Sequence, residues 1–278
     1  GNYIVENRVS RVRFSGIVTV YVPVEIAIAP TNGRFGQPGH NSRIETADFI
    51  GTSAGEAAKG GADSRFGKDQ AVNGVKIAYL GFTESTNGLS LPDDSDVVLV
   101  KAADESYLQQ RIMKAREQAD FVIVNAHWGN EYTHEPTAAQ RELAEKLALW
   151  GADVIIGTHP HVIQPVEYIV NNDGRKTLVA YSLGNFISAQ NRGPRMLGGM
   201  LNFELVKNNS TGETTVENVV FEGTVTHFGY GMSNVRVYPL DEYTEELASK
   251  HGVKNKTSDF SLQYLYDILN EVIDKQFI

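Results

Sequence analysis

Hydrophobic residues occur in short continuous runs through the middle of the chain. The runs cover residues 75–81, 121–124, 154–156 and 177–182, and polar or glycine-containing segments follow them. Continuous apolar runs of this length are typical of strands that are buried on both faces of a sheet. We therefore expect a buried strand at each of the four runs.

Two segments between these runs have helical patterning. Residues 105–118 are helical in composition, and residues 137–150 place apolar side chains at helical spacing just before Gly151, a residue typical of helix ends. Strands that alternate with helices indicate right-handed crossovers and a sheet covered by helices. The fold class is therefore predicted to be α/β.

The pattern changes again after residue 198. Residues 201–206 and 217–221 are strand-like and are separated by the polar, glycine-containing break 208–212, which predicts a hairpin with an exposed turn. We expect residues 198–240 to form antiparallel strands that complete a sheet. A final helix is predicted over residues 261–275.

The amino-terminal part is less regular. Residues 17–22 and 24–28 are β-branched runs interrupted by Pro23, which indicates one broken strand or two short ones. Residues 31–70 are rich in Gly, Ala, Ser, Asn and charged side chains, without a helical or strand period. We expect a long loop or a mobile segment there.

Composition narrows the function classes. The 278 residues are 41% hydrophobic and 21% charged, as in ordinary globular proteins, and no apolar run approaches the ~20 residues of a membrane helix. A net charge of −9 with scattered basic residues would repel a phosphate backbone, so we expect no nucleic-acid partner. The absence of cysteine excludes disulfides and thiolate ligands. We expect no signal peptide in this chain, which begins at Gly1.

Histidines follow two of the predicted strands. His127 comes shortly after the run 121–124, and His159 and His161 follow the run 154–156. The carboxyl ends of strands in an open α/β sheet border the crevice where ligands bind. Imidazole is a common nitrogen ligand for Zn, Mn or Fe, so we expect the three side chains to converge on one cavity.

The residues around the histidines suit this role. We expect Gly157 to allow a sharp turn and Pro160 to stiffen the link between His159 and His161. A single histidine after a strand is more often a hydrogen-bonded loop residue than a ligand. Three histidines at two strand ends, with Glu131 close behind one of them, make metal binding the better interpretation.

The remaining polar candidates have simpler interpretations. Asn185 lies beside a glycine after the fourth predicted strand, where an asparagine usually forms a turn and can also brace a ligand or contact substrate. His134, His227 and His251 have no comparable setting. We expect them to be ordinary surface or turn histidines.

Three motifs in this order, "AHWGNEY", "GADVIIGTHPHVIQPVEYI" and "YSLGNFISAQ", resemble the CapA family of poly-γ-glutamate and capsule-related proteins, a branch of the calcineurin-like metallophosphoesterases. The resemblance implies a metallophosphoesterase-like α/β/β/α sandwich with a divalent metal ion, Mn, Zn or Fe. It implies metal-ligand positions at His127, His159 and His161. Glu131 matches an acidic position that is a ligand or its support, and Asn185 matches a position that supports the site.

The resemblance also divides the chain. It extends from "NGVKIAYLGFT" to "YGMSNVRVYPL". We expect an atypical or incomplete segment at 1–72, the CapA-like core at 73–240 and a helical extension at 241–278.

Half of the family's metal site has no counterpart in the sequence. Family members carry Gly-Asp, Asn-Leu-Glu and Asn-Asn-His motifs that supply the other ligands, and this chain contains none of the three. Three histidines without a bridging carboxylate do not neutralise two dications. We therefore expect at most one tightly held ion and weak phosphoesterase activity.

The resemblance implies two candidate functions. The first is capsule or poly-γ-glutamate biosynthesis through metal-assisted hydrolysis, as in a metal-dependent hydrolase. The alternative is a non-catalytic accessory or binding protein of the cell envelope with a partial metal site. Either function implies the capsule polymer or its synthesis machinery as partner, and an extracellular or envelope-associated location.

Overall fold

The computed structural model describes residues 9–14, 70–72, 75–86, 88, 90, 93 and 99–278. The strands predicted within residues 17–28 lie outside these ranges, and so does the loop predicted at 31–70 except for Gln70, which begins a strand. The predicted boundary at residue 73 and the other domain limits stay predictions.

Among the described residues, a six-stranded sheet has the order β2-β3-β4-β5-β7-β6. The inner strands β3, β4, β5 and β7 run parallel, whereas β2 and β6 pair antiparallel at the two edges. All four predicted buried strands are confirmed, and β6, which the sequence analysis did not predict, completes the sheet. The bounds are β2 Gln70–Val72, β3 Val75–Thr83, β4 Phe121–His127, β5 Val154–Thr158, β6 Val166–Val170 and β7 Lys176–Ala180.

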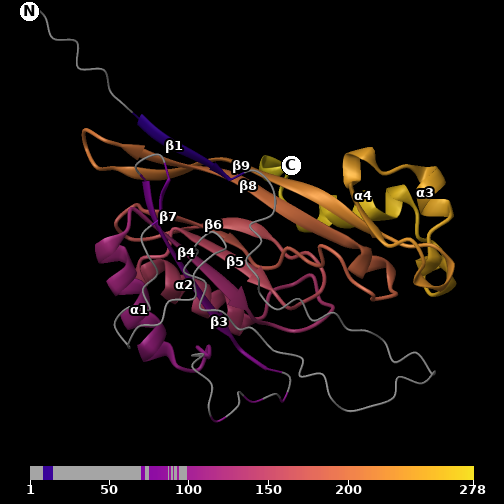
Figure 1. The fold of residues 1–278 in the computed structure, drawn as a ribbon, viewed down its shortest axis with the longest axis horizontal. Helices are drawn as coiled ribbons and strands as arrows, with labels where there is room; N and C mark the ends of the chain where they lie inside the picture. The colour runs from indigo at the N-terminus through magenta and orange to yellow at the C-terminus, as the bar shows by residue number, and fades with distance from the viewer. Residues whose placement is uncertain are drawn as a thin grey trace, which may run out of the picture.

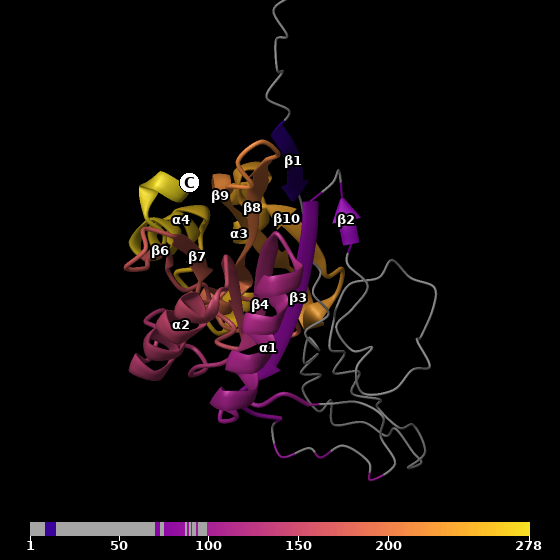
Figure 2. The same cartoon turned by 90° about the vertical axis from the view of Figure 1, so that its left-hand side faces the viewer.

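Two helices cover one face of this sheet (Figure 2). They are α1, Glu105–Gln118, and α2, Ala138–Trp150, and both were predicted. Thr137 caps the amino terminus of α2 in a capping box. Its hydroxyl accepts a hydrogen bond from the Gln140 backbone N–H, and the Gln140 side chain accepts one from the Thr137 backbone N–H. Apolar side chains of the helices and the sheet form one continuous buried cluster between them.

A second, antiparallel sheet lies against the other face of the first (Figure 1). Its described strands have the order β1-β8-β9-β10, with β1 Val9–Phe14, β8 Leu197–Asn208, β9 Thr214–His227 and β10 Arg236–Pro239. The predicted hairpin is confirmed: β8 and β9 pair, and their turn is exposed. The layers of helices, parallel sheet and antiparallel sheet confirm the predicted α/β class.

The carboxyl-terminal segment is helical and packs at one end of β8 and β9 (Figure 1). It contains α3, Glu245–Ser249, and the predicted final helix α4, Leu262–Val272. Ala248, Leu265 and Leu269 are buried in the same apolar cluster that joins the two sheets. None of the helices in the described ranges has the length and apolar character that crossing a membrane requires.

His251, which we expected to be an ordinary surface or turn histidine, lies at the start of the turn Gly252–Asn255 and anchors this segment from a buried position. It is 2% exposed. Its Nε2–H donates to the Thr226 carbonyl at 2.9 Å, and its Nδ1 accepts from the Val253 backbone N–H at 2.9 Å. Because burial disfavours the imidazolium, the pKa of His251 is lowered to about 4.

This burial predicts acid sensitivity. The unfolded chain protonates His251 near its ordinary pKa of 6.5, whereas the folded chain resists protonation until about pH 4. The stability contributed by neutral His251 is therefore complete above its unfolded pKa and is lost as pH falls toward 4. We expect the free energy of unfolding to drop by about 2 kcal/mol between pH 7 and pH 5 through this residue. Urea titrations of the wild type and His251→Gln should differ in this pH slope. His134→Gln is the control, and equal slopes for all three proteins would refute the assignment.

Candidate metal centre

The parallel strands bring the histidine segments to one edge of the sheet. Strands β4 and β5 pair in register, with His127 opposite Thr158. The Trp128 backbone N–H donates to the Thr158 carbonyl at 3.2 Å, which continues the pairing one residue further. The loops after both strands therefore start side by side, as the sequence predicts.

Three of the residues predicted to bind metal bring their side-chain donor atoms close together. One side-chain atom from each of Glu131, His159 and His161 lies within 4.8 Å of the other two. The His161 Nε2 is 3.8 Å from the Glu131 Oε1. The side chain of His161 is 13% exposed and that of Glu131 is 39% exposed, so the group opens to solvent on the glutamate side.

His127 lies beside this group but outside it. Its ring centre is 4.5 Å from that of His159, and its Nδ1 is 2.8 Å from the Thr83 hydroxyl. The structure thus places His127 next to the group without making it a fourth member. Its predicted role as a ligand stays a prediction.

Gly157 is required for a different reason from the one that we expected. It lies within β5 and does not turn the chain. A β-carbon at this position would overlap the Tyr181 carbonyl of the adjoining chain segment and would also meet the Trp128 indole. Glycine is needed here because two neighbouring segments approach its backbone closely.

The backbone at the two histidines is in a sparsely populated conformation. His159 has φ of 98° and His161 has φ of 61°, values that L-residues with a β-carbon seldom adopt. The Tyr132 backbone N–H donates to the intervening Pro160 carbonyl at 2.8 Å, which ties this turn to the loop after β4. Backbone strain of this kind concentrates at functional sites.

Asn185 fixes the orientation and tautomer of His161. Its Nδ2 donates to the carbonyls of His161, at 3.1 Å, and Arg195, at 3.2 Å. Its Oδ1 must therefore be the atom that lies 2.9 Å from the His161 Nδ1. An amide oxygen only accepts, so Nδ1 carries a proton, and Nε2 is the ring nitrogen that faces Glu131.

The donor set suits a divalent metal ion. Two imidazoles and one carboxylate are ligands for Zn, Mn or Fe, and ligating histidines usually donate their second ring N–H to a fixed acceptor, as His161 does to Asn185. Ligand atoms around one such ion lie roughly 3.5 Å apart. The donor atoms of the group lie within 4.8 Å of one another, so the side chains would have to move closer together to bind one ion.

Two residues that sequence reasoning missed lie at the rim of the group. The Tyr132 ring stacks on His161 with centres 5.9 Å apart and 23° between the planes. The guanidinium carbon of Arg195 lies 3.4 Å from the centre of the Tyr132 ring. Tyr132 closes the "AHWGNEY" motif and Arg195 follows the "YSLGNFISAQ" motif, so nearness to the motifs was the available signal.

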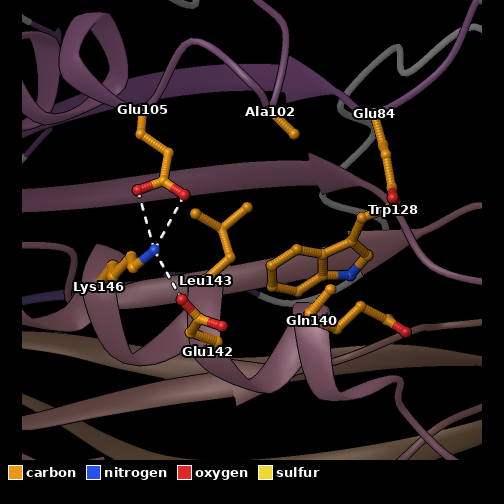
Figure 3. A pocket seen from close by; sticks show the side chains of 9 residues that line it. Glu84, Ala102, Glu105, Trp128, Gln140, Glu142, Leu143 and Lys146 are labelled. Atoms are coloured by element: carbon orange, nitrogen blue, oxygen red, sulfur yellow. Dashed lines mark hydrogen bonds and ion pairs between the residues drawn. The ribbon is translucent and has the colours of Figure 1, made fainter.

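A pocket elsewhere on the sheet is separate from these residues. It has a volume of about 170 Å³ and is lined by residues of α1, α2 and the ends of β3 and β4. Figure 3 shows Lys146 between Glu105 and Glu142, with the Trp128 indole alongside. Lys146 is therefore paired with two carboxylates that also line the pocket. None of the predicted metal ligands lines it.

His134 has the ordinary role that we expected. Its Nδ1 lies 2.8 Å from the carbonyl of Ile163, to which it donates, so this hydrogen bond joins the loop after β4 to the loop after β5. It is not part of the Glu131, His159 and His161 group.

Comparison with known proteins identifies the family. Residues 35–190 match the family described as bacterial capsule synthesis protein PGA_cap, and this range includes the strand-end loops described above. The chain belongs to this family, which agrees with the CapA resemblance of its motifs.

Two curated relatives carry capsule-related names. The chain is 40% identical over 189 residues to the PGA biosynthesis protein CapA of Bacillus subtilis, which covers 68% of this chain and 43% of that protein. It is 37% identical over 125 residues to the capsule biosynthesis protein CapA of Bacillus anthracis, covering 44% of this chain and 29% of that protein. The chain thus matches less than half the length of either relative.

Solved structures give weaker similarities. A phosphatase from Mycoplasma pneumoniae aligns with 14% identity and a TM-score of 0.34 over 53% of each chain. The NAD nucleotidase of Haemophilus influenzae aligns with 14% identity and a TM-score of 0.33, over 72% of this chain and 40% of that one. At such scores, the fold assignment rests on the layers of this chain itself.

Replacing Gly157 by alanine should destabilise the protein. The added methyl group would collide with the Tyr181 carbonyl and the Trp128 indole, and overpacking at a buried strand costs about 3 kcal/mol. Chemical denaturation should detect the loss. Gly174→Ala is the control: its φ is 84° and its surroundings are open, so the cost should be about 1 kcal/mol. Equal losses in the two variants would contradict the packing argument.

Replacing Asn185 by alanine should weaken metal binding. Without its amide, His161 loses the acceptor that fixes its tautomer, and such changes typically lower metal affinity roughly 10- to 100-fold. Competition with a fluorescent chelator would measure the affinity. Asn171→Ala, in the turn between β6 and β7, is the control. A folded Asn185→Ala protein with unchanged affinity would contradict the role assigned here.

Proposed function

We propose that this chain is a capsule biosynthesis protein of the CapA type that binds one divalent metal ion and uses it in hydrolysis. The observation that carries the proposal is the convergence of Glu131, His159 and His161, with the tautomer of His161 fixed by Asn185. Family membership supplies the biological setting.

Each residue of the group has a defined part. His161 offers the lone pair of Nε2, and His159 offers a ring nitrogen from the same strained turn. Glu131 offers a carboxylate that lowers the net charge of a bound dication and accepts hydrogen bonds. When bound, a divalent ion supplies Lewis acidity toward a water molecule and the substrate oxygen.

The donor set favours one ion over two. Within the described residues the group holds a single carboxylate and two imidazoles. Two adjacent dications need bridging carboxylates that neutralise their charge. We infer one ion per chain and slow turnover of simple phosphoesters, in line with the missing family motifs.

The partner of this activity is inferred from the relatives' names. They connect the family with capsule and with PGA biosynthesis, which favours the capsule polymer or its synthesis machinery as partner. An extracellular or envelope-associated location follows from the same proposal.

Metal content tests the proposal directly. The wild type, loaded with Mn²⁺ or Zn²⁺ and passed through gel filtration, should retain about one equivalent, because three protein ligands suffice for a tight site. His161→Ala and Glu131→Gln should each lose most of that metal. Elemental analysis gives the count, and hydrolysis of p-nitrophenyl phosphate should fall in parallel.

Glu135→Gln is the matched control, since Glu135 lies four residues beyond Glu131 and its side chain is 85% exposed. It should keep the wild-type metal content. Two retained equivalents would refute the one-ion count and show that further residues, such as His127, add ligands. Metal retention without any hydrolysis would favour the non-catalytic accessory protein, and no retained metal would refute the proposal.

A further inference from the structure

The side chain of Arg195 has an unusual setting for an arginine in an acidic protein. The chain carries 34 Asp and Glu against 25 Lys and Arg. Nevertheless, within the described residues no carboxylate forms an ion pair with Arg195, and its recorded contact is with the Tyr132 ring at 3.4 Å. The guanidinium is therefore held by stacking and not by charge neutralisation.

The stacked position leaves the hydrogen-bonding edges of the guanidinium available. Stacking on an aromatic ring uses the flat face of the group, whereas its N–H donors point outward in its plane. Those donors match the two oxygens of a carboxylate or phosphate. Tyr132 is 45% exposed and Arg195 is half-buried, so solvent reaches both side chains.

Two structural connections hold Arg195 close to the candidate metal ligands. The Tyr132 ring that carries the guanidinium also stacks on His161. In addition, the amide of Asn185 joins the backbone of Arg195 to the ring of His161. The guanidinium consequently lies at the rim of the Glu131, His159 and His161 group.

The turn that carries Arg195 is fixed on both sides. It is the 3-10 turn Gly193–Met196, whose Met196 side chain is fully buried immediately before β8. The Gly193 backbone N–H donates to the Thr257 hydroxyl at 2.9 Å in the carboxyl-terminal segment. A side chain on so constrained a turn is positioned before any ligand binds.

We propose that Arg195, supported by Tyr132, binds an oxyanion of the substrate, a phosphate or a carboxylate, beside the metal group. This inference rests on the proposed function, because it assigns the substrate class of the same site. The stacked guanidinium binds the oxyanion through paired N–H donors. Glu131, His159 and His161 lie beside the bound oxyanion. Substrates without a negative group next to the reacting bond are bound poorly.

Equilibrium binding tests the inference independently of catalysis. Isothermal titration calorimetry on the Mn²⁺-loaded and EDTA-treated protein would use inorganic phosphate and, separately, a short γ-linked glutamate peptide. Charge-assisted hydrogen bonds of this kind account for roughly 10- to 100-fold in affinity. Arg195→Gln should weaken binding by that factor, Tyr132→Leu should weaken it less, and Arg195→Lys should recover part of the loss.

The matched control is Arg192→Gln, three residues away and exposed, which should bind as the wild type does. The probe whose affinity depends on Arg195 identifies the oxyanion as phosphate or carboxylate. Unchanged binding of both probes by Arg195→Gln, or no binding of either probe by the wild type, would overturn the inference.

Metal analysis of the same samples separates the two proposals. Retained metal with no dependence on Arg195 refutes only the oxyanion role. Arg195-dependent binding that persists in a protein unable to retain metal refutes only the metal proposal.

Discussion

The close approach of three chain segments at Gly157 is the constraint on which the candidate site depends. The Tyr181 carbonyl occupies the space that a side chain at Gly157 would need, and it accepts a hydrogen bond of 3.0 Å from the Trp128 indole. One backbone oxygen thus ties together the carboxyl ends of β4, β5 and β7. The loops that begin there carry Glu131, the histidine turn and Asn185. Packing in the sheet therefore sets the relative positions of these loops without a ligand.

The histidine turn stores strain that this packing offsets. Positive φ angles at His159 and His161 cost of order 1–3 kcal/mol each, and they persist only where the surroundings determine the backbone. The hydrogen bond from Tyr132 to the Pro160 carbonyl, and those that Asn185 makes, hold the turn from both sides. These contacts hold the backbone in the conformation that places donor atoms of both imidazoles within 4.8 Å of each other.

The sequence predicts the elements well and the site only in part. Buried strands and helices follow from continuous apolar runs and from the helical period, which are local properties, so the parallel strands, both flanking helices and the hairpin are confirmed. The role predicted for Gly157 was wrong, because its close contacts come from residues far away in the sequence. The same reason explains why Tyr132 and Arg195 were missed and why the burial of His251 was not predicted. His127 illustrates the intermediate case, since its strand end was predicted correctly while its side chain lies beside the donor group.

The candidate site is built from two parts of the chain that are held in place by different contacts. The ligand candidates come from loops at the carboxyl ends of parallel strands, where α/β sheets generally bind ligands. The rim comes from the turn at Arg195, which is held by Thr257 in the carboxyl-terminal segment, and that segment is in turn anchored by buried His251. Because Asn185 and Tyr132 contact both Arg195 and His161, displacement of this turn would also disturb the candidate ligands. The rim and the donor group are thus coupled through two shared residues, although different segments of the chain carry them.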